Sequence, residues 1–73
     1  MSAKEMFEDL GYKKETHISY ILYIKNEGDY SQQEQRIFFR HDTETIIKPF
    51  TDGINVKELQ AINKQVEELG WNK

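Results

Sequence analysis

Two six-residue segments of the same character occur near opposite ends of the chain. Residues 7–12 read FEDLGY and residues 66–71 read VEELGW. In each segment a glycine follows leucine and precedes an aromatic residue. This order is typical of a helix C-terminus, where the glycine adopts a left-handed conformation and the next residue folds back on the last turn. We therefore expect a helix at each end of the chain, with Tyr12 against Phe7 and Trp71 against Val66.

Both expected helices also have a clear N-terminal signal. Ser2 and Glu5 have the spacing of a capping box, and so do Asn55 and Glu58. In this motif the cap side chain and the glutamate each bond to the other's backbone. Apolar residues then recur at helical spacing. They are Met6, Phe7 and Leu10 in the first helix, and Val56, Leu59, Ile62, Val66 and Leu69 in the second.

The longest strand signal covers residues 16–25, where side chains alternate with a period of two. One alternating set is apolar or aromatic throughout, and we expect it to face the core. The other set is mixed, and we expect it to face solvent or a partner. The inward set is Ile18, Tyr20, Leu22 and Ile24, and the outward set includes His17, Ile21, Tyr23 and Lys25.

Two further strands are expected over residues 34–40 and 43–48. In the first of them Ile37 and Phe39 would point inward. Pro49 ends the last strand because it has no amide hydrogen for a β-ladder. Turn-forming residues at 26–29, 41–42 and 51–53 separate the elements.

These elements predict an α+β fold. Their order is α-β-β-β-α, and the short connections favour an antiparallel sheet. Two amphipathic helices need an apolar surface to cover, and one face of the sheet supplies it. We expect residues 1–73 to form a single domain, with a three-stranded antiparallel sheet, two helices packed on one face and the other face open.

Composition narrows the classes of function. The chain has 73 residues, no cysteine and a net charge of −3 with both signs well mixed. The charge is opposite to that of a non-specific nucleic-acid binder. Cysteine-based zinc sites are excluded, and a deep preorganised active site is hard to build at this size. Because no run of 18 apolar residues occurs, we expect no membrane association and a cytoplasmic location.

The two histidines give little support to catalysis. With Asp42 or Glu44, His17 and His41 could form a metal site or a general-base pair, but their spacing fits neither. No phosphate-binding glycine loop or nucleophile elbow is present. We therefore expect no enzyme activity, no metal and no cofactor.

The open sheet face carries the candidate binding residues. On the expected register it combines aromatic, aliphatic and arginine side chains: Ile21, Tyr23, Arg36, Phe38 and Arg40. Such a face can anchor a protein partner, and it can also stack the bases of a nucleic acid. It can equally be an ordinary exposed sheet face or the contact of a homodimer.

The order α-β-β-β-α also occurs in double-stranded-RNA-binding domains. Those domains carry a Gly-Pro-x-His loop between their first two strands and a lysine cluster at the start of the last helix. Here the corresponding loop, residues 26–33, contains neither proline nor histidine, and Lys57 is a single lysine beside Glu58. The similarity is therefore one of element order only.

Both ends of the chain resemble a group of phage-borne proteins. Residues 3–12 (AKEMFEDLGY) and 56–71 (VKELQAINKQVEELGW) are similar to the termini of small uncharacterised proteins from phages and prophages of Gram-positive bacteria. The resemblance implies an accessory product of a mobile element, and it transfers no functional residue. We expect a non-enzymatic module that contacts a host or phage protein in the host cytoplasm, with a homodimer as a further option. Nucleic-acid binding through the open face is the alternative.

Overall fold

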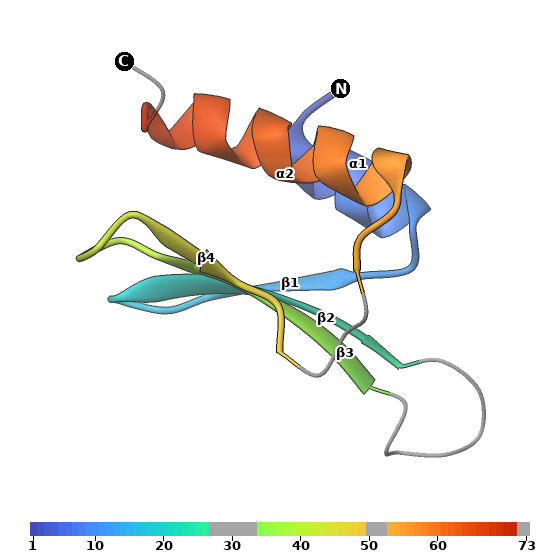
Figure 1. The fold of residues 1–73 in the computed structure, drawn as a ribbon, viewed down its shortest axis with the longest axis horizontal. Coiled ribbons are helices and arrows are strands. Elements are labelled where there is room, and N and C mark those ends of the chain that lie inside the picture. Colours follow the sequence, from blue (N-terminus) through green and yellow to red (C-terminus); the bar gives the residue numbers. More distant parts are fainter. Residues whose placement is uncertain (27–33, 50–52, 72–73) are drawn as a thin grey trace.

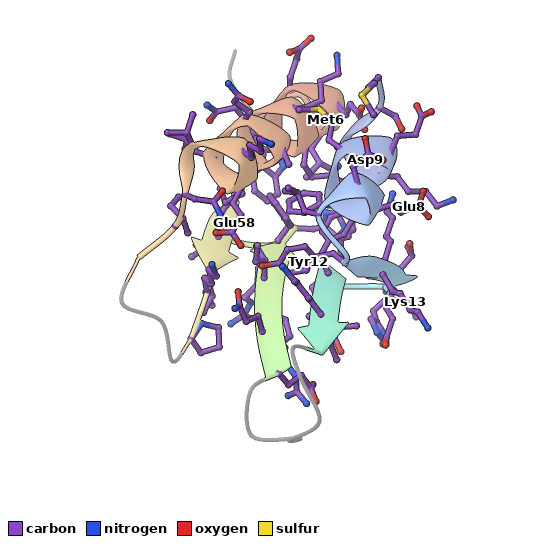
Figure 2. The ribbon with its side chains drawn as sticks, turned by 90° about the vertical axis from the view of Figure 1, so that its right-hand side faces the viewer. Met6, Glu8, Asp9, Tyr12, Lys13 and Glu58 are labelled. Atoms are coloured by element: carbon purple, nitrogen blue, oxygen red, sulfur yellow. The ribbon has the colours of Figure 1, made fainter. Side chains whose placement is uncertain are left out.

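The computed structural model describes residues 1–26, 34–49 and 53–71. The antiparallel sheet has its strands in chain order, and both helices lie on one side of it (Figure 1). α1 lies over the β1 side of the sheet and α2 over the β4 side (Figure 2). The α+β class is confirmed, but the sheet has four strands where three were expected. The elements are α1 (Ala3–Asp9), β1 (Lys13–Thr16), β2 (Tyr20–Asn26), β3 (Glu34–Arg40), β4 (Thr45–Ile47) and α2 (Val56–Leu69).

The additional strand is β1, which sequence periodicity did not indicate. β1 reads KKET and has no apolar residue, so it shows no alternation to detect. A turn at residues 17–19 separates it from β2, and the expected single strand over 16–25 is therefore wrong. Ile18, expected in the core, lies in this turn and is fully exposed.

The expected facing of β2 is also wrong. Tyr23 lies opposite Ile37, and Ile21 lies opposite Phe39. Residues directly opposite each other in an antiparallel pair share a face of the sheet. Since Ile37 and Phe39 are fully buried, as expected, Ile21 and Tyr23 lie on the helix-covered face with them. The residues expected to face inward, Tyr20, Leu22 and Ile24, lie on the opposite face, where Leu22 is nevertheless only 8% exposed.

Both helix ends form as expected. Gly11 and Gly70 have φ values of +94° and +75°. The Tyr12 amide donates to the Phe7 carbonyl at 3.0 Å, and the Trp71 amide donates to the Val66 carbonyl at 3.1 Å. The rings of Phe7 and Tyr12 meet edge to face at 5.5 Å. Both capping boxes are present, and each helix therefore begins and ends at residues specified locally.

The core lies between the helices and the two central strands. The Phe7 ring from α1 stacks on Tyr23 at 3.8 Å and meets Phe39 edge to face at 6.1 Å. Ala61 and Ile62 of α2 cover the same cluster. The buried side chains that the sheet contributes to this core therefore come from β2 and β3.

The buried face of α2 differs from the expected stripe. Val56 and Leu59 are 69% and 43% exposed, whereas Glu58 and Gln65 are buried. Gln65 can be buried because its side-chain oxygen accepts a hydrogen bond of 2.5 Å from the Tyr23 hydroxyl. Burial raises the pKa of Tyr23, so this hydroxyl remains protonated and available as a donor. A buried tyrosine needs a polar partner, and that need rotates the helix away from its most apolar side.

β4 is shorter than the expected strand over 43–48. A turn at residues 41–44 precedes it, and Glu44 adopts a φ of +50° there. Thr45 pairs with Arg40 and Ile47 with Phe38, so β4 forms one edge of the sheet. Most of the turns expected at 26–29 and 51–53 lies outside the described residues.

Candidate functional site

The structure divides the five candidate binding residues between two faces. Arg36, Phe38 and Arg40 lie on the open face, as expected from β3. Ile21 and Tyr23 are 6% and 0% exposed and belong to the core, so their assignment to the open face is wrong. The reason is the shifted phase of β2, which turns its other side chains to the open face.

The open face therefore has a different composition from the expected one. β2 contributes Tyr20, Leu22 and Ile24, and Ile47 of β4 lies opposite Phe38. Ser19, Tyr20, Phe38, Arg40 and Ile47 line a shallow hollow on this face. The centre of the face is thus more apolar than the sequence analysis indicated.

Aromatic side chains form a row across this face. The His17 ring stacks on Tyr20, with ring centres 4.4 Å apart and planes inclined by 22°. The Tyr20 ring lies 5.7 Å from that of Phe38. The Tyr20 ring therefore connects the His17 ring of the β1–β2 turn with the Phe38 ring of β3. The sequence pattern does not indicate Tyr20 as a site residue, because it places Tyr20 among the core-facing residues of β2.

Each arginine of the open face lies beside a carboxylate. Arg36 Nε donates to Glu34 Oε1 at 2.5 Å, and Arg40 Nη2 donates to Asp42 Oδ2 at 3.1 Å. Both arginine side chains remain about half exposed, at 50% and 49%. The face therefore combines an apolar centre with guanidinium groups whose charge is largely balanced at short range.

A second constellation is a buried polar cluster around Glu58. Tyr12, which follows α1, donates its hydroxyl hydrogen to Glu58 Oε2 at 2.5 Å (Figure 2). Lys48 Nζ lies 3.0 Å from Glu58 Oε1, and the Asn55 amide donates to the same oxygen at 3.1 Å. The Lys48 and Glu58 side chains are only 9% and 7% exposed. The cluster joins α2 to the residue after β4 and to the end of α1.

The electrostatics of this cluster fit a structural role. Burial alone would raise the pKa of Glu58, but hydrogen bonds from Tyr12, the Asn55 backbone and Lys48 outweigh burial and lower the pKa below its usual 4.5. A general acid or base needs a pKa near the operating pH and access to a substrate proton. The Glu58 carboxylate lacks the first, because its lowered pKa keeps it ionised, and its oxygens already accept these donors. It fixes the start of α2.

The two histidines have separate surroundings. His17 lies 3.3 Å from Glu15 and stacks on Tyr20, whereas His41 meets Trp71 edge to face at 6.5 Å. In the three described stretches no group of three or more His, Cys, Asp or Glu side chains is placed to hold a metal ion. Neither helix that the structure describes is long and apolar enough to cross a bilayer.

Comparison of the chain with protein-family models, curated proteins and solved structures finds no match.

Proposed function

We propose that this protein is a non-enzymatic accessory protein of a phage or prophage that acts as a small protein-interaction module. The open sheet face is its contact surface. The observation that supports this proposal best is the row of adjoining rings, His17, Tyr20 and Phe38, beside the arginines of β3.

The composition of this face favours a protein partner. Energetically dominant interface residues are enriched in tyrosine and arginine, and they cluster around an apolar centre with a polar rim. Tyr20 and Phe38 supply such a centre, and Arg40 lines the same hollow. The Arg40 side chain also has apolar methylene groups that pack against a partner while its guanidinium stays hydrated.

The alternative, a nucleic-acid partner, has less support. Stacked bases would suit the aromatic row, but affinity for nucleic acid depends on positive charge facing the phosphates. Arg36 and Arg40 are each neutralised by a neighbouring carboxylate, and the chain carries a net charge of −3. A protein surface makes no such demand for net positive charge.

The biological setting is part of the same proposal. The resemblance of residues 3–12 and 56–71 to the ends of small phage and prophage proteins favours an accessory gene of a mobile element. Its product would act in the cytoplasm of the host cell. Its partner would be a host or phage protein.

A retention experiment tests the contact surface. The purified protein is immobilised and exposed to a host lysate, in parallel with a Phe38→Ala, Arg40→Ala double variant. A matched control is the Val56→Ala, Lys57→Ala double variant, which removes exposed side chains from α2 and leaves the sheet face intact. We expect one protein to be retained by the wild type and the α2 control and lost from the β3 variant. Equal retention by all three would contradict the proposal.

Salt and nuclease treatment separate the two classes of partner. A nucleic-acid complex should be removed by nuclease and should weaken steeply as salt rises, because binding releases counterions. A protein contact centred on Tyr20 and Phe38 should survive nuclease and respond only weakly to salt. Retention that disappears with nuclease would replace the proposal with the alternative.

A further inference from the structure

β4 leaves an edge of the sheet open. The strand order is β1-β2-β3-β4, and no other strand in the described part of the chain pairs with the outer side of β4. In an antiparallel ladder alternate residues direct their amide and carbonyl groups to opposite sides. The outward groups of β4 therefore have the geometry to accept another strand.

The two edges of the sheet differ in charge. β1 carries Lys13, Lys14 and Glu15, and charged side chains on an edge oppose pairing with a further strand. β4 consists of Thr45, Ile46 and Ile47 and carries no charge. Both isoleucines are 38% exposed. Only the β4 edge has the composition of a pairing edge.

The flank of α2 next to β4 continues this uncharged strip. Glu68 contacts Ala3 of α1, which fixes the side of α2 that faces α1. At about 100° per residue, Leu59 lies about 180° around the helix from Glu68, and Val66 about 160°. By this helical geometry both residues lie on the flank of α2 away from α1. α2 itself lies over the β4 side of the sheet (Figure 2). Leu59 is 43% exposed there.

We propose that two copies of the chain pair through their β4 strands, antiparallel about a twofold axis at Ile46, and form one continuous eight-stranded sheet. Centring the axis on Ile46 pairs all three residues, because Ile46 then meets its own copy and Thr45 meets Ile47.

A second copy fits this edge for two reasons. A strand is the partner that satisfies outward amide and carbonyl groups together, and a twofold axis makes one patch complementary to itself. Each chain has a net charge of −3, so close association requires an uncharged strip. β4 and the flank of α2 with Leu59 and Val66 provide one, and the α2 flanks add apolar contact to a short ladder.

This pairing goes beyond the proposed function and has a consequence for it. The open faces of the two copies would become neighbouring halves of one sheet surface. That surface would present two aromatic rows to a partner, and linked sites bind more tightly than single ones. Ile46 lies opposite Phe39 and therefore on the helix-covered side, so the open face stays accessible in the paired form.

The first test is the mass in solution. Sedimentation equilibrium over a concentration series should show a species of about 17 kDa, twice the 8.7 kDa of one chain. An Ile46→Lys variant should weaken the dimer at least about tenfold in Kd, because it places two like charges on the axis. The matched control is Thr16→Lys, which puts the same charge on the corresponding face of β1 and should leave Kd unchanged. Circular dichroism checks that both variants fold.

The second test locates the interface independently of stability. The chain has no cysteine, so a single introduced cysteine reports one contact. Opposed residues of an antiparallel pair have Cα atoms about 4.5–5.5 Å apart, within the range that a disulfide spans. Ile46→Cys should therefore cross-link rapidly under mild oxidation, and Thr16→Cys should not.

A monomer at all concentrations would overturn the proposal. A dimer that cross-links through Thr16→Cys, or through neither cysteine, would overturn it as well by placing the contact elsewhere. The Phe38→Ala, Arg40→Ala variant should still form the dimer, so failure of the open-face proposal and failure of this pairing are distinguishable.

Discussion

Glu68 Oε2 accepts a hydrogen bond of 2.8 Å from the backbone amide of Ala3. Ala3 is the first residue of α1, and Glu68 lies in the last turn of α2. The first amides of a helix have no partner within it, and they carry partial positive charge. A carboxylate in the last turn of its own helix is unfavourable, because that end is partially negative. The position of Glu68 is therefore explained by its contact with α1.

Replacing Glu68 should weaken the attachment of α1 to α2. We expect Glu68→Ala to lower the free energy of unfolding by about 1 kcal/mol, because the Ala3 amide loses its charged acceptor. Glu68→Gln keeps an acceptor without the charge and should cost about half as much. The control is Glu67→Ala, whose side chain is 62% exposed and should matter by less than about 0.5 kcal/mol. Urea unfolding measures all three, and equal losses from the two alanine variants would contradict the role of Glu68.

The Lys48–Glu58 pair should show strong coupling. Glu58→Leu leaves the Lys48 ammonium buried without its carboxylate, which costs about 3–5 kcal/mol. A chain of this length has a total stability on the order of 4–11 kcal/mol, so this variant should be largely unfolded when warmed. The Lys48→Met, Glu58→Leu double variant should recover much of the loss, because no buried charge remains. A double variant as unstable as Glu58→Leu would show that the loss comes from the bonds to Tyr12 and Asn55 instead.

Acid should destabilise the fold through the same carboxylate. The pKa of Glu58 is lower in the folded state than its usual 4.5, so the unfolded chain binds the proton more readily. The resulting stabilisation is fully present above about pH 5 and is lost as the pH falls through the folded pKa. Glu58→Gln removes this titration. The free energy of unfolding, measured with urea, should therefore fall less steeply between pH 7 and pH 3 for Glu58→Gln than for the wild type. Equal slopes for the two proteins would contradict this role of Glu58.

Local signals in the sequence predicted the helices well. The capping residues, the two left-handed glycines and the contact of Tyr12 with Phe7 depend only on neighbours in the chain. The bounds of β3 and its inward residues were also predicted. Ile37 and Phe39 are two residues apart, and an arginine flanks each of them on its outer side. These features need no knowledge of tertiary structure.

The strands around residue 20 were not predictable in the same way. Residues 20–24 are apolar or aromatic throughout, so periodicity cannot choose between the two phases of β2. The choice is made by Ile37 and Phe39, which lie across the ladder. β1 could not be predicted from its pattern, because a charged edge strand has no apolar face. Two of the five candidate residues, Ile21 and Tyr23, were consequently assigned to the wrong face.

The buried side of α2 depended on hydroxyl groups elsewhere in the fold. Glu58 and Gln65 appear solvent-facing in a helical pattern, but they accept hydrogen bonds from Tyr12 and Tyr23. No property of the helix sequence alone indicates that two tyrosines will be buried against it. The apolar residues displaced by this rotation include Leu59, which lies on the exposed flank proposed to meet a second copy.

Gly70 offers a test of the helix end that is free of packing effects. A Cβ added at Gly70 would meet no atom within 4 Å, and the same holds at Gly53. The two positions differ in backbone conformation, because Gly70 has a φ of +75° whereas Gly53 is outside the left-handed region. Gly70→Ala should therefore cost about 1 kcal/mol from the left-handed conformation alone.

Gly53→Ala serves as the matched control, and it should leave stability unchanged or raise it by up to about 1 kcal/mol by restricting the unfolded chain. In a domain of this size a loss of 1 kcal/mol lowers the melting temperature by about 4–8 °C. Thermal unfolding of the two variants measures the difference directly. If both alanines shifted the melting temperature equally, the left-handed glycine would not be what ends α2, and the turn that brings Trp71 back over Phe39 would need another cause.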